Sequence, residues 1–187
     1  QAYDNRQDAK IGVGWAKDWD PDDRVYRSRR SDNNELAVWD DVEPGMDKDP
    51  YVGILRFDTL ADEPIAIGIN FGIHGIIHSE TNPLLSADAS LSVEHVMREQ
   101  FDEKVVVMHM QAGGGDASPA GSDKGGFARN ETIGLHALDA LYALWEQTPT
   151  SADPIRLETT SRHVPVHPNN IRVTRDGEVD WYYAPYN

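Results

Sequence analysis

Two segments of the chain place chemically reactive side chains just beyond apolar runs. The first run, 105–111, leads into a loop that holds a candidate nucleophile, Ser118, behind Gly113, Gly114 and Gly115. The second run, 67–73, ends at His74, a candidate metal ligand. Glycine amides can converge on a developing oxyanion, and α/β proteins build their sites where strands end. The two segments therefore indicate chemistry at one edge of a sheet.

Spacing alone leaves simpler interpretations open. Lys124 follows Ser122-Asp123 instead of a glycine, which excludes a phosphate-binding P-loop. Ser118 lacks both flanking glycines of a nucleophile elbow, so its hydroxyl can equally serve to cap turn amides. His74 and His78 have the spacing of a helical zinc pair, but Gly75 and the isoleucines between them disfavour a helix. His74 can equally be a hydrogen-bonded histidine at the edge of the core.

Composition excludes several classes of function. The 187 residues suffice for one domain with a core, and the formal net charge of −15 disfavours binding to nucleic acid or anionic lipid. The chain has no cysteine, hence no disulfide or thiolate metal site. No apolar run approaches the ~18 residues of a membrane span, and no signal-peptide pattern follows Gln1. Asn130-Glu131-Thr132 fits an N-glycosylation sequon, a triplet that is common by chance.

Hydrophobic periodicity predicts a layered α/β domain in which helices flank a mixed β-sheet. We expect strands at 9–15, 51–58, 65–73, 104–110, 155–166 and 170–175, with 51–58 and 65–73 forming an antiparallel hairpin. Apolar residues at helical spacing predict helices at 88–101 and 131–147, the first capped by Ser86 or Asp88. A loop rich in glycine, serine and aspartate is expected at 111–130, and a linker at 149–154.

Several blocks together resemble the neutral/alkaline ceramidase family. They occur in matching order and spacing at Arg27-Ser28, Ile54–Phe57, Ile69–Gly75, Thr81–Asp88 and Gln111–Pro119, so that the resemblance covers roughly half of the chain. It implies a segment of a catalytic domain in which His74 binds the catalytic zinc ion and Ser118 is the catalytic serine. Enzymes of this family cleave the amide bond of ceramide, releasing a fatty acid and sphingosine. The resemblance also implies a secreted or periplasmic location.

Zinc can polarise the amide carbonyl, and the amides of Gly113, Gly114 and Gly115 are candidates to hold the oxyanion. The family's remaining zinc ligands correspond to polypeptide before Gln1 and after Asn187. We therefore expect residues 1–187 to be a single segment of the catalytic domain, completed by further segments or chains of the same enzyme.

The chain also departs from the family pattern within its motifs. Gly113 stands where the family has a polar asparagine, and the residues just after His74 differ. These departures leave open the same fold and metal acting on another amide or an ester. A non-catalytic structural piece of a larger assembly is the third hypothesis.

Overall fold

The structure is a computed structural model that describes residues 3–4, 6–28, 48–115 and 117–161, and the backbone of 171–173 and 179–181. The chain divides into two compact units, Gln1–Asp153 and Pro154–Asn187. The first unit holds every candidate site residue. Within the described residues, no helix is long and apolar enough to cross a membrane.

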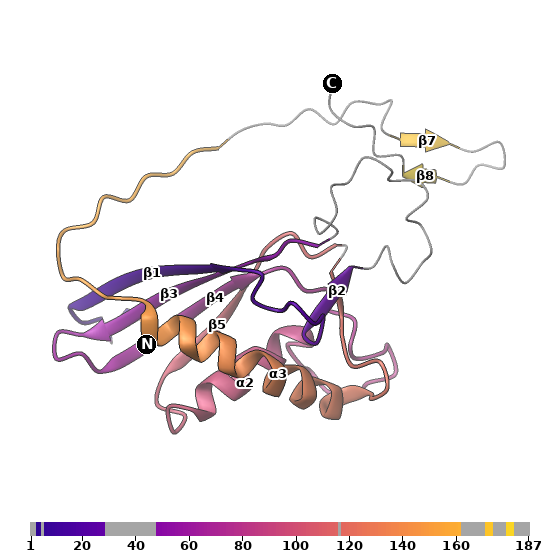
Figure 1. The fold of residues 1–187 in the computed structure, drawn as a ribbon, viewed down its shortest axis with the longest axis horizontal. Helices are drawn as coiled ribbons and strands as arrows, with labels where there is room; N and C mark the ends of the chain where they lie inside the picture. The colour runs from indigo at the N-terminus through magenta and orange to yellow at the C-terminus, as the bar shows by residue number, and fades with distance from the viewer. Residues whose placement is uncertain are drawn as a thin grey trace. The chain divides into compact units, whose positions relative to one another are not determined.

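A four-stranded sheet forms the centre of the first unit (Figure 1). Its strands are β1 (Ala9–Lys17), β3 (Tyr51–Thr59), β4 (Pro64–Phe71) and β5 (Val106–Gln111), in the order β1-β3-β4-β5. The first two pairs are antiparallel and β4 runs parallel to β5, so the predicted mixed sheet and the predicted hairpin are both confirmed. Two helices, α2 (Ala89–Glu99) and α3 (Gly126–Gln147), pack on the sheet (Figure 1).

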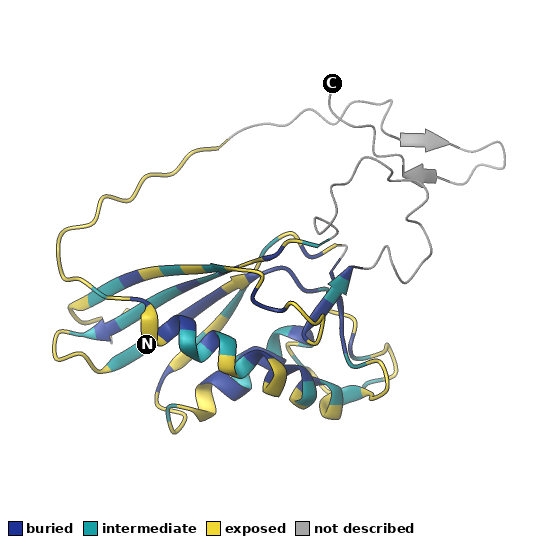
Figure 2. Cartoon of the chain, viewed as in Figure 1, coloured by how far each residue is buried: buried dark blue, intermediate teal, exposed yellow. Residues whose placement is uncertain are grey.

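The core lies between the helices and one face of the sheet. Strand residues alternate in exposure, visible as stripes along β1 in Figure 2, because successive side chains point to opposite faces. Buried residues of β3 and β4 meet buried residues of both helices: Ile54, Ile69, Phe71, Met97, Ile133 and Leu141. Gly134 lets the helices approach closely, because a Cβ at this position would lie 2.3 Å from the carbonyl oxygen of Ser92.

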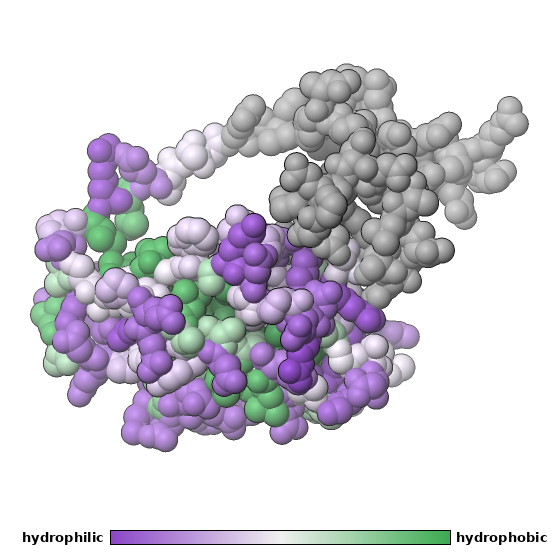
Figure 3. Space-filling model, in the orientation of Figure 1, coloured by the Kyte–Doolittle hydropathy of each residue, from purple (hydrophilic) through white to green (hydrophobic). Residues whose placement is uncertain are grey.

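The opposite face of the sheet presents apolar side chains to solvent. Val13, Leu55, Gly68 and Met108 form one cross-strand row, in which Val13 is 71% and Met108 55% exposed. Trp15, Tyr51 and Val106 are also exposed. Figure 3 shows hydrophobic residues reaching the molecular surface among hydrophilic ones. Among the described residues, nothing buries these five large side chains, which we call the open face of the sheet.

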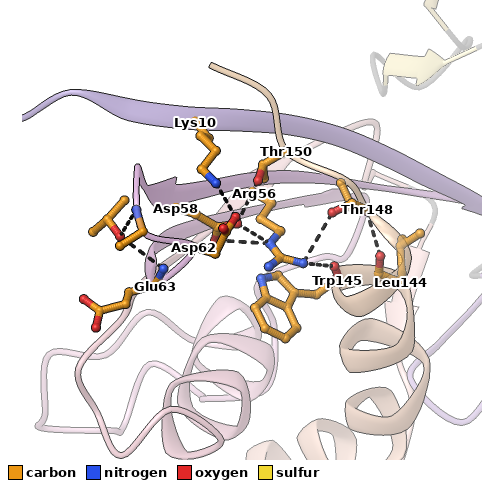
Figure 4. A network of polar contacts seen from close by, with 11 residues as sticks. Lys10, Arg56, Asp58, Asp62, Glu63, Leu144, Trp145, Thr148 and Thr150 are labelled. Atoms are coloured by element: carbon orange, nitrogen blue, oxygen red, sulfur yellow. Dashed lines mark hydrogen bonds and ion pairs between the residues drawn. The ribbon is translucent and has the colours of Figure 1, made fainter. Parts of the chain in front are cut away.

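One arginine joins the covered face of the sheet to the end of α3 (Figure 4). Arg56 donates to both carboxylate oxygens of Asp58 at 2.9 and 3.1 Å, and Asp58 is fully buried. Arg56 Nη1 also donates to the carbonyl oxygens of Trp145 (3.0 Å) and Thr148 (3.3 Å), and its guanidinium carbon lies 4.1 Å from the Trp145 ring centre. The last turn of α3 has no basic residue of its own, so Arg56 supplies the positive charge that favours a helix C-terminus.

Predicted elements with strong periodicity form close to their expected positions, but two expectations were wrong in part. The expected loop at 111–130 contains a short strand, β6 (Ala117–Pro119), and the first turn of α3. The expected strand at 155–166 does not form in its described part, 155–161, where every residue is exposed and no described strand pairs with it. Residues 162–166 lie outside the described ranges. In the second unit β7 (Ile171–Val173) pairs with β8 (Val179–Trp181), which confirms a strand within 170–175.

Candidate functional site

Ser118 lies in a two-stranded ribbon that joins distant parts of the chain. Strand β6 pairs antiparallel with β2 (Tyr26–Ser28), and Ser118 lies directly across from Arg27. Side chains of directly opposed residues project on the same side of an antiparallel pair. The side chain of Arg27 therefore projects on the same side of the ribbon as the side chain of Ser118, and Ser118 is 9% exposed.

A buried aspartate fixes the turn that leads into β2. The carboxylate of Asp20 accepts backbone N–H groups from Arg24 (2.9 Å), Val25 (3.1 Å) and Tyr26 (3.1 Å). Lys48 Nζ donates to the same carboxylate at 3.3 Å. Because this carboxylate holds three consecutive amides, it sets the path of the chain one residue before Arg27.

His74 lies next to the same ribbon. Its backbone N–H donates to the carbonyl oxygen of Ala117 at 2.8 Å, so the two predicted site segments are adjacent through the residue before Ser118. The His74 side chain is half-buried and lines a cavity of about 450 Å³. Because β4 and β5 are parallel, their carboxyl ends meet at one edge of the sheet, and this cavity lies there.

The glycine loop forms one wall of this cavity. Gly114 and Gly115 line it, together with Ile73, Gly75, Ala89, Ser90, Gln111 and Ala112. The loop passes directly against the end of β4, since a Cβ on Gly72 would lie 2.4 Å from the carbonyl oxygen of Gly113. Gly113 and Ser118 are not among the described lining residues, and Asp116 lies outside the described ranges. An oxyanion role of the three glycines therefore stays a prediction.

Arg129 is a functional candidate that the sequence did not reveal. Its Nε donates to the carbonyl oxygen of Ala120 at 2.7 Å, and its Nη2 donates to that of Pro119. Partial burial lowers the pKa of Arg129, and the positive charge of Arg27 lowers it further. Two arginines thus flank the strand that carries Ser118, one across the ribbon and one bound to its carboxyl end.

Asp88 does not cap α2 as expected. Its side chain makes no hydrogen bond to the helix, and instead its carboxylate accepts the backbone N–H groups of Ile77 and His78, each at 2.9 Å. The hydrogen bonds that hold the loop after His74 therefore outweigh the local preference of Asp88 for capping α2. Ser86 accepts the N–H of Asp88 at 3.3 Å, so neither predicted residue caps the helix with its side chain.

Asn130 anchors the same loop to α3 and is buried, 3% exposed. Its Oδ1 pairs with His78 Nε2 at 2.8 Å, and its Nδ2 donates to the carbonyl of Asp88 (2.7 Å) and the hydroxyl of Ser92 (3.0 Å). The amide of the sequon is thus engaged in the core, and the folded chain does not present it as a glycosylation acceptor.

Replacing Asn130 with alanine should destabilise the protein by about 1–3 kcal/mol, because His78 and Ser92 would each lose a hydrogen-bond partner and the Asp88 carbonyl would lose one of its donors. Urea unfolding of the variant measures this loss. Glu131→Ala is the matched control, since Glu131 is the next residue of the helix and is exposed. Equal stability of the two variants would contradict a structural role for the Asn130 network.

The described residues do not by themselves form a complete metal site. No group of three or more His, Cys, Asp or Glu side chains within the described ranges could hold a metal ion. A catalytic zinc ion usually takes about three protein ligands and one open position. His74, half-buried at the cavity wall, fits the role of one such ligand. Completing a zinc site around His74 would therefore need at least one ligand from outside the described residues.

The fold and the site together define a mixed α/β domain in which the segments that carry His74 and Ser118 lie next to each other at the carboxyl edge of its parallel strands. Among solved structures, neutral ceramidase from Pseudomonas aeruginosa matches with a TM-score of 0.59 and 19% identity, over 74% of this chain and 23% of its own. A structure of a ceramidase complexed with C2 matches with a TM-score of 0.61 and 19% identity, over 74% of this chain and 22% of its own.

These matches confirm the resemblance to neutral ceramidase at the level of the fold. The chain spans less than a quarter of the length of either structure. No family model matches the chain, and no curated protein matches it.

Proposed function

We propose that this chain forms part of the catalytic domain of a zinc-dependent hydrolase that cleaves the N-acyl amide bond of ceramide or a ceramide-like lipid. The observation that carries the proposal is the hydrogen bond from the His74 amide to the Ala117 carbonyl, which joins two motifs found separately in the sequence. The shared fold with ceramidase structures supports it. A secreted or periplasmic location follows from the same resemblance and stays a prediction.

Each site residue has a role in this proposal. His74 is one ligand of a zinc ion, which when bound would supply Lewis acidity toward the amide carbonyl. Ser118 attacks the carbonyl carbon or orients the attacking water. Arg27, across the ribbon, places positive charge where negative charge develops near Ser118. The glycines 113–115 are the candidate donors to the oxyanion.

We further propose that the working enzyme contains more polypeptide than these residues. A complete zinc site needs ligands beyond His74, and the matched structures are more than four times as long as the matched region. The open face of the sheet is the surface that additional polypeptide of the same enzyme would cover, because exposed apolar patches of this kind mark contact surfaces.

Zinc dependence is tested on the full-length enzyme with a fluorescent ceramide. We expect stoichiometric zinc by atomic absorption and loss of turnover after chelation, restored by added zinc. His74→Ala should lower turnover by more than about 100-fold, because loss of even an outer-shell partner of a metal site costs 10–100-fold.

His95→Ala serves as the matched control. His95 lies on α2, is 45% exposed at its side chain and pairs only weakly with Glu99 at 3.5 Å. It should keep both zinc content and turnover. Full activity of His74→Ala, or of the chelated enzyme, would refute the proposed zinc site.

A second candidate is an enzyme of the same fold and metal acting on an ester or a smaller amide. Gly113 removes a polar side chain from the loop, and Ile76, which follows the lining residue Gly75, presents an apolar side chain that is 42% exposed. A panel of acyl esters and N-acyl amides of increasing chain length separates the two candidates. Preference for long-chain ceramide would exclude the ester or smaller amide as substrate. If the zinc-loaded enzyme turned over no substrate at all, the chain would instead be a non-catalytic structural piece of a larger assembly.

A further inference from the structure

The cavity that His74 lines also has a serine hydroxyl on its wall, and this hydroxyl is in hydrogen-bond contact with a histidine. Ser90, in the first turn of α2, lines this cavity together with His74. Its Oγ lies 2.9 Å from Nδ1 of His109, which projects from β5. This pair joins residues on different elements and belongs to no motif of the sequence.

The partner of the other ring nitrogen fixes the tautomer of His109. Nε2 of His109 lies 3.0 Å from the carbonyl oxygen of Phe71, which can only accept a hydrogen bond. Nε2 of a neutral ring must therefore carry the proton, and Nδ1 must be the acceptor. The Ser90 hydroxyl consequently donates to Nδ1, as a nucleophile donates to its general base.

Surrounding contacts hold His109 rigid and uncharged. Its ring packs on Phe71 with centroids 4.6 Å apart, and its backbone N–H donates to Glu94 Oε1 at 2.7 Å. Burial lowers the pKa of His109 below its usual value of 6.5, against the opposing effects of the Phe71 carbonyl and Glu94. The imidazole is therefore neutral at neutral pH, which is the state a general base requires.

Ser118 lacks such a base among the described residues, where its hydroxyl makes no hydrogen bond. The two serines thus differ in the chemistry available to them: Ser118 depends on a group from elsewhere for activation, whereas Ser90 already contacts an imidazole. The cavity beside Ser90, about 450 Å³, is large enough for a small acyl compound.

We propose that Ser90 and His109 form a second nucleophile–base pair, which accepts the acyl group of an ester bound in the His74 cavity. Ser90 Oγ forms a bond to the carbonyl carbon, and its proton passes to His109 Nδ1. The bond from that carbon to the leaving oxygen then breaks, and the leaving oxygen takes the proton from Nδ1. Water hydrolyses acyl-Ser90 by the reverse sequence of proton transfers, which releases the acid and restores the hydroxyl.

This acyl transfer needs no metal and does not involve Ser118, so it stands apart from the proposed amide hydrolysis. The test uses the full-length enzyme treated with a chelator and then with a fluorophosphonate, whose phosphorus bonds to the serine as fluoride leaves. Peptide mass spectrometry locates the label. We expect it on Ser90, and 4-nitrophenyl acetate should be hydrolysed with unchanged rate after chelation.

His109→Asn is the informative variant, because the asparagine carbonyl can still accept from Ser90 but cannot take up its proton. Labelling should slow by at least about 100-fold, the usual contribution of a general base, while the unfolding temperature reports on the fold. Ser86→Ala, four residues before Ser90, should label like the wild type. Absence of label on Ser90 in the wild type, or unchanged labelling in His109→Asn, would overturn the proposal, and the wild-type result decides even if the variant fails to fold.

Discussion

Arg56→Leu should destabilise the protein by about 3–5 kcal/mol, the cost of leaving a buried charge without its partner. Asp58 is fully buried and receives two hydrogen bonds from the Arg56 guanidinium. After the substitution it would keep the hydroxyl of Thr150, at 3.0 Å, which carries no charge. The C-terminal turn of α3 would also lose the donor to the Trp145 and Thr148 carbonyls.

The double variant Arg56→Leu/Asp58→Asn separates these contributions. Neutralising Asp58 removes the uncompensated charge, so the double variant should recover part of the lost stability, and the remaining loss reports on the helix end. Lys104→Leu is the matched control, because Lys104 and its partner Asp102 are 78% and 85% exposed and exposed pairs contribute little. Denaturant unfolding measures all three variants. A loss from Arg56→Leu as small as that from Lys104→Leu would show that the network in Figure 4 does not hold the sheet to α3.

The sequence predicted those helices and strands whose hydrophobic pattern is complete within one segment of the chain. The alternating runs that became β1, β3 and β4 and the apolar stripes of α2 and α3 each show their period within one segment. Arg56 also lay within a recognised motif, but nothing near it in sequence indicates its partners at the end of α3. Those partners, Trp145 and Thr148, come 89 and 92 residues later.

Pairing between distant segments explains what the sequence did not reveal. Strands β2 and β6 are three residues each and have no period of their own, and they exist because they pair with one another. The contact of Ser90 with His109 similarly depends on α2 packing beside β5. Asp88 shows the converse case, in which the local preference of aspartate for capping gave a wrong prediction, because its carboxylate binds the amides of Ile77 and His78 instead.

The same reasoning explains why the candidate site was predicted only in part. His74 and Ser118 were found because their residue types and the glycines nearby stand out in the sequence, and the structure brings their segments together through Ala117. Arg129 was missed because it lies in a stretch whose glycines and serines resemble a loop, while the structure extends α3 through it. Side chains that bind to backbone carbonyls, as Arg129 does, leave no pattern in composition or spacing.

Ser118→Ala should lower the hydrolysis of a fluorescent ceramide by the full-length enzyme by about 10³-fold or more, the scale of loss when a catalytic serine is removed. Its stability should hardly change. The serine hydroxyl makes no hydrogen bond among the described residues, and the pairing of β6 with β2 uses the backbone, which alanine retains. Activity and stability are therefore expected to separate in this variant, in contrast to Arg56→Leu.

Ser122→Ala, in the turn that follows β6 and exposed, is the matched control and should keep the wild-type rate. Ser90→Ala distinguishes the two serines, because it should abolish labelling by the fluorophosphonate in the chelated enzyme while Ser118→Ala retains it. Rates are compared at saturating zinc and with unfolding temperatures measured in parallel. Wild-type turnover by Ser118→Ala would remove this serine from the amide reaction, whereas loss of turnover together with a large drop in unfolding temperature would assign Ser118 to the fold. A catalytic role for the Ser118 hydroxyl, across the ribbon from Arg27, therefore requires that Ser118→Ala lose its hydrolysis rate while its unfolding temperature stays constant.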